Sequence, residues 1–108
     1  MTEAIQIVTT VADQQEAERI ADFLVSQRLA ACVQIGGPVT SLFRWEGKLD
    51  MAREWQLTIK THASRYAEVE AAIRRNHTYD EPEILALPIV AGSEGYLRWL
   101  AESVDAAV

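Results

Sequence analysis

The chain has 108 residues, of which 49% are hydrophobic and 24% charged, and its formal net charge is −6. This length and composition predict one globular domain over residues 1–108 that can bury its own core without a disulfide or a structural metal. Nucleic acid and membrane surfaces are excluded as expected partners, because both attract basic proteins. Because Cys32 is the single cysteine and no segment looks like a secretory signal or a membrane span, we expect a cytoplasmic protein.

The first part of the chain predicts a strand followed by a helix. Residues 4–11 alternate apolar and polar side chains, which is typical of a half-buried strand. Asp13 stands three residues before Glu16, a pattern that resembles a capping box. Apolar residues then recur at helical spacing, so we expect a helix that begins directly after Asp13.

A long hairpin is predicted next. Residues 31–35 and 39–45 form its outgoing strand, and the Gly36-Gly37-Pro38 sequence between them predicts a bulge. Residues 49–60 of the returning strand span roughly 40 Å at about 3.3 Å per residue, whereas a compact domain of this size is about 35 Å across. The hairpin should therefore project beyond its own core. Its outer half is apolar, so we expect another copy of the chain to cover it.

The tip of this hairpin allows two registers. A two-residue turn at positions 47 and 48 places Trp45 opposite Asp50. A three-residue loop at 46–48 places Trp45 opposite Leu49 and gathers the apolar side chains on one face. We prefer the second register, because a buried apolar face is what usually fixes strand register.

The remainder of the chain, from residue 62 onward, predicts a helix, a short strand and a final helix. Apolar residues at helical spacing predict the first helix within residues 62–76. Residues 83–90 contain Pro88, which favours an edge strand, and Ser93 can cap the final helix. The order is β-α-β-β-α-β with a trailing helix. It predicts an α+β fold, a ferredoxin-like βαββαβ sandwich with a long β-hairpin and an extra C-terminal helix.

Few residues in the sequence indicate a catalytic, metal-binding or ligand-binding site. The sequence has no nucleophile elbow, P-loop or dinucleotide-binding motif, so we do not expect an enzyme. His77 lies next to Asn76 and the polar segment 79–83, and imidazole with carboxylates suits a divalent cation. A polar loop ahead of an edge strand is the more frequent meaning of such a segment. Trp45 at a hairpin tip favours packing at an interface over stacking on a ligand.

Four segments together resemble the CutA family of divalent-cation tolerance proteins. They are RLAACVQIGGPVTSLFRWEGKL (28–49), QLTIKT (56–61), HTYDEPEILALPI (77–89) and YLRWL (96–100). The resemblance implies a ferredoxin-like fold and a homotrimer in which hairpins and edge strands of neighbouring subunits pair. It also implies ligand-binding clefts between subunits, lined by Phe43, Trp45, Glu46, Lys48, Lys60, Tyr79 and Glu83.

The resemblance further implies a link to tolerance of copper and other divalent metals. In copper-binding members the ligands are a Cys that ends the first strand and a His pair before the Y-x-x-PE motif. Thr9 and the Asn76-His77 pair occupy these positions here. Only His77 remains as a metal ligand, so we expect no required cofactor and only weak binding of a divalent metal such as copper.

The shape of the family is also similar to that of the PII signalling proteins. This similarity gives an alternative function, a sensor that binds a small anionic molecule in the cleft between subunits. Lys48 and Lys60 would meet the charge of such a ligand, and Trp45 would stack on it.

Overall fold

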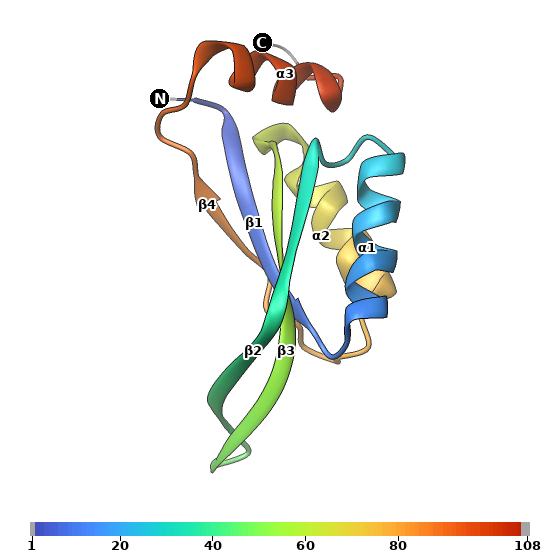
Figure 1. Ribbon diagram of the computed structural model, residues 1–108, viewed down its shortest axis with the longest axis vertical. Coiled ribbons are helices and arrows are strands. Elements are labelled where there is room, and N and C mark those ends of the chain that lie inside the picture. Colours follow the sequence, from blue (N-terminus) through green and yellow to red (C-terminus); the bar gives the residue numbers. More distant parts are fainter. Residues whose placement is uncertain (1, 107–108) are drawn as a thin grey trace.

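The computed structural model describes residues 2–106, and its elements follow the predicted order (Figure 1). The strands are β1 (Ala4–Val11), β2 (Cys32–Trp45), β3 (Lys48–His62) and β4 (Leu85–Pro88). The helices are α1 (Gln14–Ser26), α2 (Tyr66–Asn76), which follows a short 3-10 turn at Ala63–Arg65, and α3 (Glu94–Ser103). No helix in residues 2–106 combines the length and the hydropathy of a membrane span.

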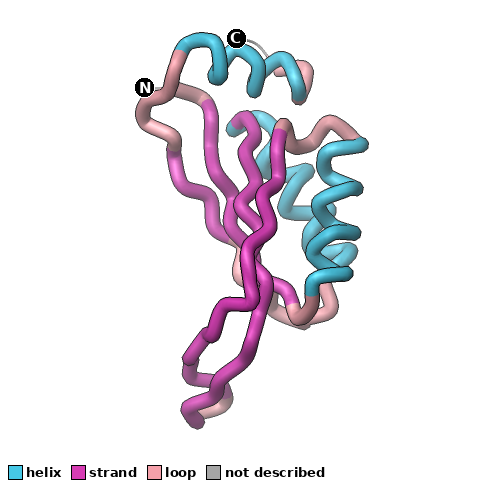
Figure 2. The backbone as a smooth tube through the Cα atoms, in the orientation of Figure 1, coloured by secondary structure: helices cyan, strands magenta, loops and turns pink. Residues whose placement is uncertain are grey.

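All four strands form one antiparallel sheet in the order β2-β3-β1-β4. Helices α1 and α2 lie on one face of the sheet, and α3 lies across the end that is opposite the hairpin tip (Figure 2). The α+β, ferredoxin-like prediction with an extra C-terminal helix is therefore confirmed. Pro88 lies in the edge strand β4, as its missing N–H requires.

Local signals account for the ends of the helices, and apolar burial accounts for their packing. The Asp13 side chain accepts a hydrogen bond of 2.8 Å from the Glu16 N–H and so caps α1. Ser93 caps α3 in the same way through the Tyr96 N–H. The core lies between the sheet and the two helices, and its largest buried side chains are Ile7, Val11, Ile20, Leu24, Leu57, Ile59, Val69 and Ile73.

The β2–β3 hairpin projects well beyond the helices, as predicted (Figure 1). It gives the molecule a long axis of 45 Å against 25 and 22 Å for the other two. The projecting part carries large apolar side chains that are exposed in the single chain: Leu42, Phe43, Trp45, Leu49 and Met51.

The register at the hairpin tip differs from the one that we preferred. Trp45 lies opposite Lys48, so Glu46 and Gly47 form a two-residue turn. Their φ angles are 50° and 80°, and positive values at both positions are typical of a type I′ turn, whose twist matches that of the strands. The apolar pattern did not fix the register because this part of the hairpin packs against nothing within the chain.

The observed register divides the apolar side chains between the two faces of the hairpin. Leu42 pairs with Met51, and Leu49 lies on the same face. Phe43 and Trp45 therefore lie on the other face. Each face of the projecting hairpin thus presents apolar surface to solvent in the single chain.

The predicted bulge lies where the hairpin leaves the core. The register of β2 on β3 shifts between Gly36 and Val39. Gly37 has a φ of 156°, and a Cβ atom built on it would lie 2.8 Å from Cδ1 of Trp55. The bulge therefore needs glycine at position 37, both for its backbone conformation and for the close approach of the indole.

We expect Gly37→Ala to lower the free energy of unfolding by about 1–3 kcal/mol, because the added methyl group meets the Trp55 ring and the backbone is strained. The matched control is Gly36→Ala, since a Cβ there would have no atom within 4 Å. Urea unfolding followed by circular dichroism at one protein concentration measures both. Equal losses in the two variants would contradict this account of the bulge.

Candidate functional site

A hollow of about 850 Å³ lies between the projecting hairpin and the loop that joins α2 to β4. We call it the hairpin cleft. The hairpin contributes aromatic and carboxylate side chains, and the loop contributes a run of polar ones. The lining residues are Thr10, Ser41, Leu42, Phe43, Arg44, Trp45, Ala52, Glu54, Tyr79, Asp80, Glu81, Pro82 and Glu83.

The structure brings together some of the predicted site residues and separates others. Four of them line the hairpin cleft: Phe43, Trp45, Tyr79 and Glu83. Glu46 lies in the turn at the hairpin tip, and Lys48 follows that turn. Lys60 lies near the other end of β3, where its Nζ donates a hydrogen bond of 2.5 Å to the Gln34 side chain.

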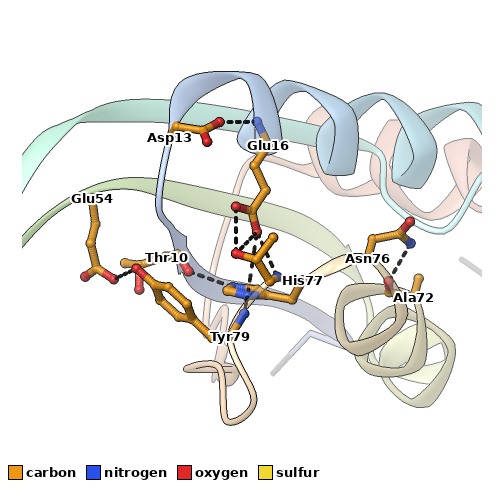
Figure 3. A network of polar contacts seen from close by, with 9 residues as sticks. Thr10, Asp13, Glu16, Glu54, Ala72, Asn76, His77 and Tyr79 are labelled. Carbon is orange, nitrogen blue, oxygen red and sulfur yellow. Dashed lines mark hydrogen bonds and ion pairs between the residues drawn. The ribbon is translucent and has the colours of Figure 1, made fainter. Parts of the chain in front are cut away.

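Glu54 belongs to the cleft although no pattern in the sequence indicates it. It is only 7% exposed, and its carboxylate accepts a hydrogen bond of 2.9 Å from the Tyr79 hydroxyl (Figure 3). In the sequence Glu54 follows Arg53 and precedes Trp55, so nothing distinguishes it from an ordinary charged residue of an exposed strand. Its burial comes from the loop that carries Tyr79.

The hydroxyl of Tyr79 is a stable hydrogen-bond donor. Burial and the contact with Glu54 raise the pKa of Tyr79 to about 12, because both disfavour the phenolate. The phenol therefore keeps its proton throughout the neutral range. Together the two side chains place one polar pair in the wall of the cleft.

His77 lies behind Tyr79, and its side chain is fully buried. Its Nε2 atom lies 2.8 Å from the Thr10 carbonyl oxygen, and its Nδ1 atom lies 3.0 Å from the Tyr79 backbone nitrogen (Figure 3). A carbonyl only accepts and an amide N–H only donates. These partners therefore assign the neutral tautomer with the proton on Nε2.

A second buried group, Glu16 in the first turn of α1, holds the same segment. Its carboxylate accepts hydrogen bonds from the Thr78 N–H at 3.2 Å and from the Thr78 hydroxyl at 3.1 Å. The Glu16 Oε2 atom lies 3.7 Å from Nδ1 of His77, which is too far for a hydrogen bond. The chain just after α2 is thus tied to β1 through His77 and to α1 through Thr78.

The ligand set implied for copper does not fit a metal within one chain. Thr9 is fully buried, and its hydroxyl has no hydrogen-bond partner among residues 2–106. The Asn76 amide donates to the Ala72 carbonyl oxygen at 2.7 Å. Both ring nitrogens of His77 are engaged, so a metal could bind there only after the ring had left one of its contacts. Within the described chain no three His, Cys, Asp or Glu side chains lie close enough together to hold a metal.

Carboxylates instead determine the charge of the cleft. The acidic lining residues are Glu54, Asp80, Glu81 and Glu83, and Arg44 is the basic one. Glu81 is partly neutralised by Arg74, at 3.4 Å. The cleft of one chain therefore attracts cations more strongly than anions.

Comparison with known proteins gives the family. The model of the CutA1 divalent ion tolerance protein family matches residues 5–103. The divalent-cation tolerance protein CutA of Archaeoglobus fulgidus is 41% identical over 99 residues, which cover 92% of this chain and 96% of that protein. The chloroplastic CutA of Arabidopsis thaliana is 39% identical over 100 residues, and the chain spans 55% of its length.

A solved structure agrees with this result. The crystal structure of CutA from Xylella fastidiosa superimposes with a TM-score of 0.94 at 35% identity, covering 96% of this chain and all (100%) of that one. The superposition includes both the core and the projecting hairpin, because it leaves only a few residues of this chain unmatched. The chain therefore belongs to the CutA family of divalent-cation tolerance proteins.

Proposed function

We propose that the protein acts in divalent-cation tolerance as a homotrimer, and that divalent cations bind weakly in the hairpin clefts at the boundaries between subunits. The observation that carries this proposal is the composition of the cleft, where carboxylates lie beside apolar side chains that a single chain leaves exposed. The family is named for tolerance and not for a reaction, and we propose a binding role without catalysis.

The exposed hairpin supports assembly. On one face Leu49 is 72% exposed and Met51 63%, and on the other Trp45 is 56% exposed. Contiguous apolar surface of this kind on a projecting hairpin is unfavourable in water and is normally covered by a partner. The edge strand β4 adds Leu85 and Leu87, which are 57% and 47% exposed. A second copy offers matching apolar strands, and the family resemblance favours three copies.

Assembly also supplies what a single cleft lacks. The described chain gathers no group of three metal-binding side chains, and a second subunit would add protein ligands to the few that one cleft offers. The projecting hairpin can carry Glu46 and Lys48 at its tip into the neighbouring cleft. The oxygen ligands of Asp80 and Glu83 suit hard divalent cations, whereas copper prefers the nitrogen and sulfur ligands that are missing here. Weak binding of copper follows from this ligand set.

The alternative, a PII-like sensor for a small anionic molecule, has less support. Neither Lys48 nor Lys60 lines the hairpin cleft of the single chain. Lys60 is paired with Cys32 and Gln6 in the sheet, and its distance from Glu54 along β3 is about 20 Å. An anion in the cleft would meet Arg44 as the basic lining residue, opposed by the surrounding carboxylates.

The assembly can be tested by light scattering after size exclusion. We expect the wild-type protein to elute with three times the chain mass of 12.1 kDa at micromolar concentration. The Leu49→Glu, Met51→Glu double variant should lose this assembly, because two charges would enter the proposed interface. Val25→Glu changes an exposed apolar residue on α1 and should leave the mass unchanged. A wild-type monomer would contradict the proposal.

Calorimetry with Mn²⁺ and Cu²⁺ at low ionic strength tests the cleft. We expect the Asp80→Asn, Glu83→Gln double variant to bind Mn²⁺ at least about tenfold more weakly, because two negative charges leave the cleft. Glu18→Gln with Glu94→Gln changes the net charge equally at exposed positions on α1 and α3, and it should bind like the wild type.

Titration with Cu²⁺ shows whether the metal binds to the carboxylates of the cleft or to His77. His77→Gln should still bind Cu²⁺, because both ring nitrogens of His77 already have protein partners and neither is needed as a metal ligand. Loss of Cu²⁺ binding in this variant, together with unchanged binding in the Asp80→Asn, Glu83→Gln double variant, would assign the metal to His77 instead of the cleft.

A further inference from the structure

We propose that His77 is a positioning residue for the hairpin cleft, whose ring holds Tyr79 where the phenol meets Glu54. The importance of this role for cation binding rests on the proposed function, but the geometry that carries it does not. His77 itself does not line the cleft, so it acts on a ligand only through Tyr79.

The first step is the direction of the chain after α2. His77 is the first residue past the helix, in an extended conformation. Its Nδ1 atom accepts from the N–H of Tyr79, two residues further on, at 3.0 Å. Asp and Asn side chains make the same contact in an Asx turn, which fixes the local bend of the backbone. The imidazole therefore turns the chain at Thr78 and sets the direction in which Tyr79 leaves it.

The second step is the position of this turn relative to the sheet. The Nε2 atom of His77 donates to the carbonyl oxygen of Thr10 at 2.8 Å. Thr10 pairs with Gln56 of β3, and Gln56 is two residues from Glu54 on the same face of that strand. The His77 ring thus holds the turn against β1, and β1 is the neighbour of β3, the strand that carries Glu54. The ring of Tyr79 packs against the His77 ring, with centroids 4.9 Å apart.

The third step is the effect on Glu54. The Tyr79 hydroxyl is the hydrogen-bond donor to this carboxylate among the described residues, and Glu54 is only 7% exposed. A buried carboxylate without a donor is unfavourable. When Tyr79 is in place, one carboxylate oxygen is occupied. When Tyr79 leaves, that oxygen becomes free for a cation or for water. His77 therefore controls how much of the Glu54 charge the cleft offers.

The loop has an independent anchor, which makes the role testable without unfolding. Glu16 holds Thr78 through its N–H and its hydroxyl, and neither bond involves His77. Substitution of His77 should therefore release Tyr79 from Glu54 while the segment stays attached to α1.

The hydrogen bond of Tyr79 can be followed by NMR on the assembled protein with ¹³Cζ-labelled tyrosine at one fixed pH. The Tyr79 signal is assigned from its loss in Tyr79→Phe. We expect His77→Ala to move this signal to the position that it takes in Glu54→Ala, because both changes remove the hydrogen bond between the Tyr79 hydroxyl and the Glu54 carboxylate. The double variant should show no further shift. His62→Ala removes the other histidine, which caps the 3-10 turn through Ser64, and should leave the signal in place.

Two conservative variants separate the two ties of the ring and cover the case in which His77→Ala does not fold. His77→Asn keeps an acceptor for the Tyr79 N–H but cannot reach the Thr10 carbonyl. His77→Gln has a longer side chain with an amide donor for that carbonyl. Because each variant keeps only one of the two contacts, we expect at least one of them to shift the Tyr79 signal part of the way from its wild-type position toward its position in Glu54→Ala. An unmoved Tyr79 signal in folded His77→Ala, or in both conservative variants if His77→Ala does not fold, would overturn the proposal.

Cation binding then distinguishes this proposal from the proposed function. If both hold, His77→Ala and Tyr79→Phe should change the Mn²⁺ affinity by the same factor within about twofold, in the same direction. An absence of Mn²⁺ binding in the wild type would reject the proposed function, while the NMR result would still decide the role of His77. A loss of affinity in His77→Ala that Tyr79→Phe does not share would overturn the positioning role.

Discussion

The difference in length between the hairpin and the layer that covers it is the constraint on which the rest of the structure depends. Helices α1 and α2 have 13 and 11 residues, so they are about 20 and 16 Å long. Strand β3 has 15 residues, which span about 45 Å at about 3.2 Å per step, nearly the full 45 Å long axis of the molecule. Two helices of this length cannot cover such a strand. The outer half of the hairpin is therefore uncovered in the single chain, and its apolar side chains lack a partner there.

The hairpin cleft follows from the same constraint. The chain leaves α2 at the level where the hairpin emerges from the core, and it must pass from the helical layer to the far edge of the sheet to form β4 (Figure 1). Its polar backbone and side chains cross a region that is partly buried, where unpaired groups are costly. Glu16, His77 and Tyr79 supply the partners along this crossing (Figure 3). A cleft with carboxylates in its wall is the result.

The sequence predicted those parts of the fold that depend on neighbours along the chain. Asp13 and Ser93 cap helices because a cap needs only the next turn of backbone. The bulge at Gly37 and the edge position of Pro88 were predicted from the backbone chemistry of glycine and proline. The predicted register at the hairpin tip is wrong, because the prediction relied on an apolar face that nothing in the chain buries. The Glu46-Gly47 turn, a local feature, decided it instead.

By itself, then, the sequence determined the order of the elements, the projecting hairpin and the family, since all of these are written in periodicity, turn residues and motifs. Only the tertiary structure decided the roles of single side chains in the site. His77 meets Thr10 across 67 positions of the chain, Thr78 meets Glu16 across 62, and Tyr79 meets Glu54 across 25. A polar side chain becomes a ligand, an anchor or a positioning group according to which partners reach it. Those partners are set by packing between distant segments, which no local pattern records.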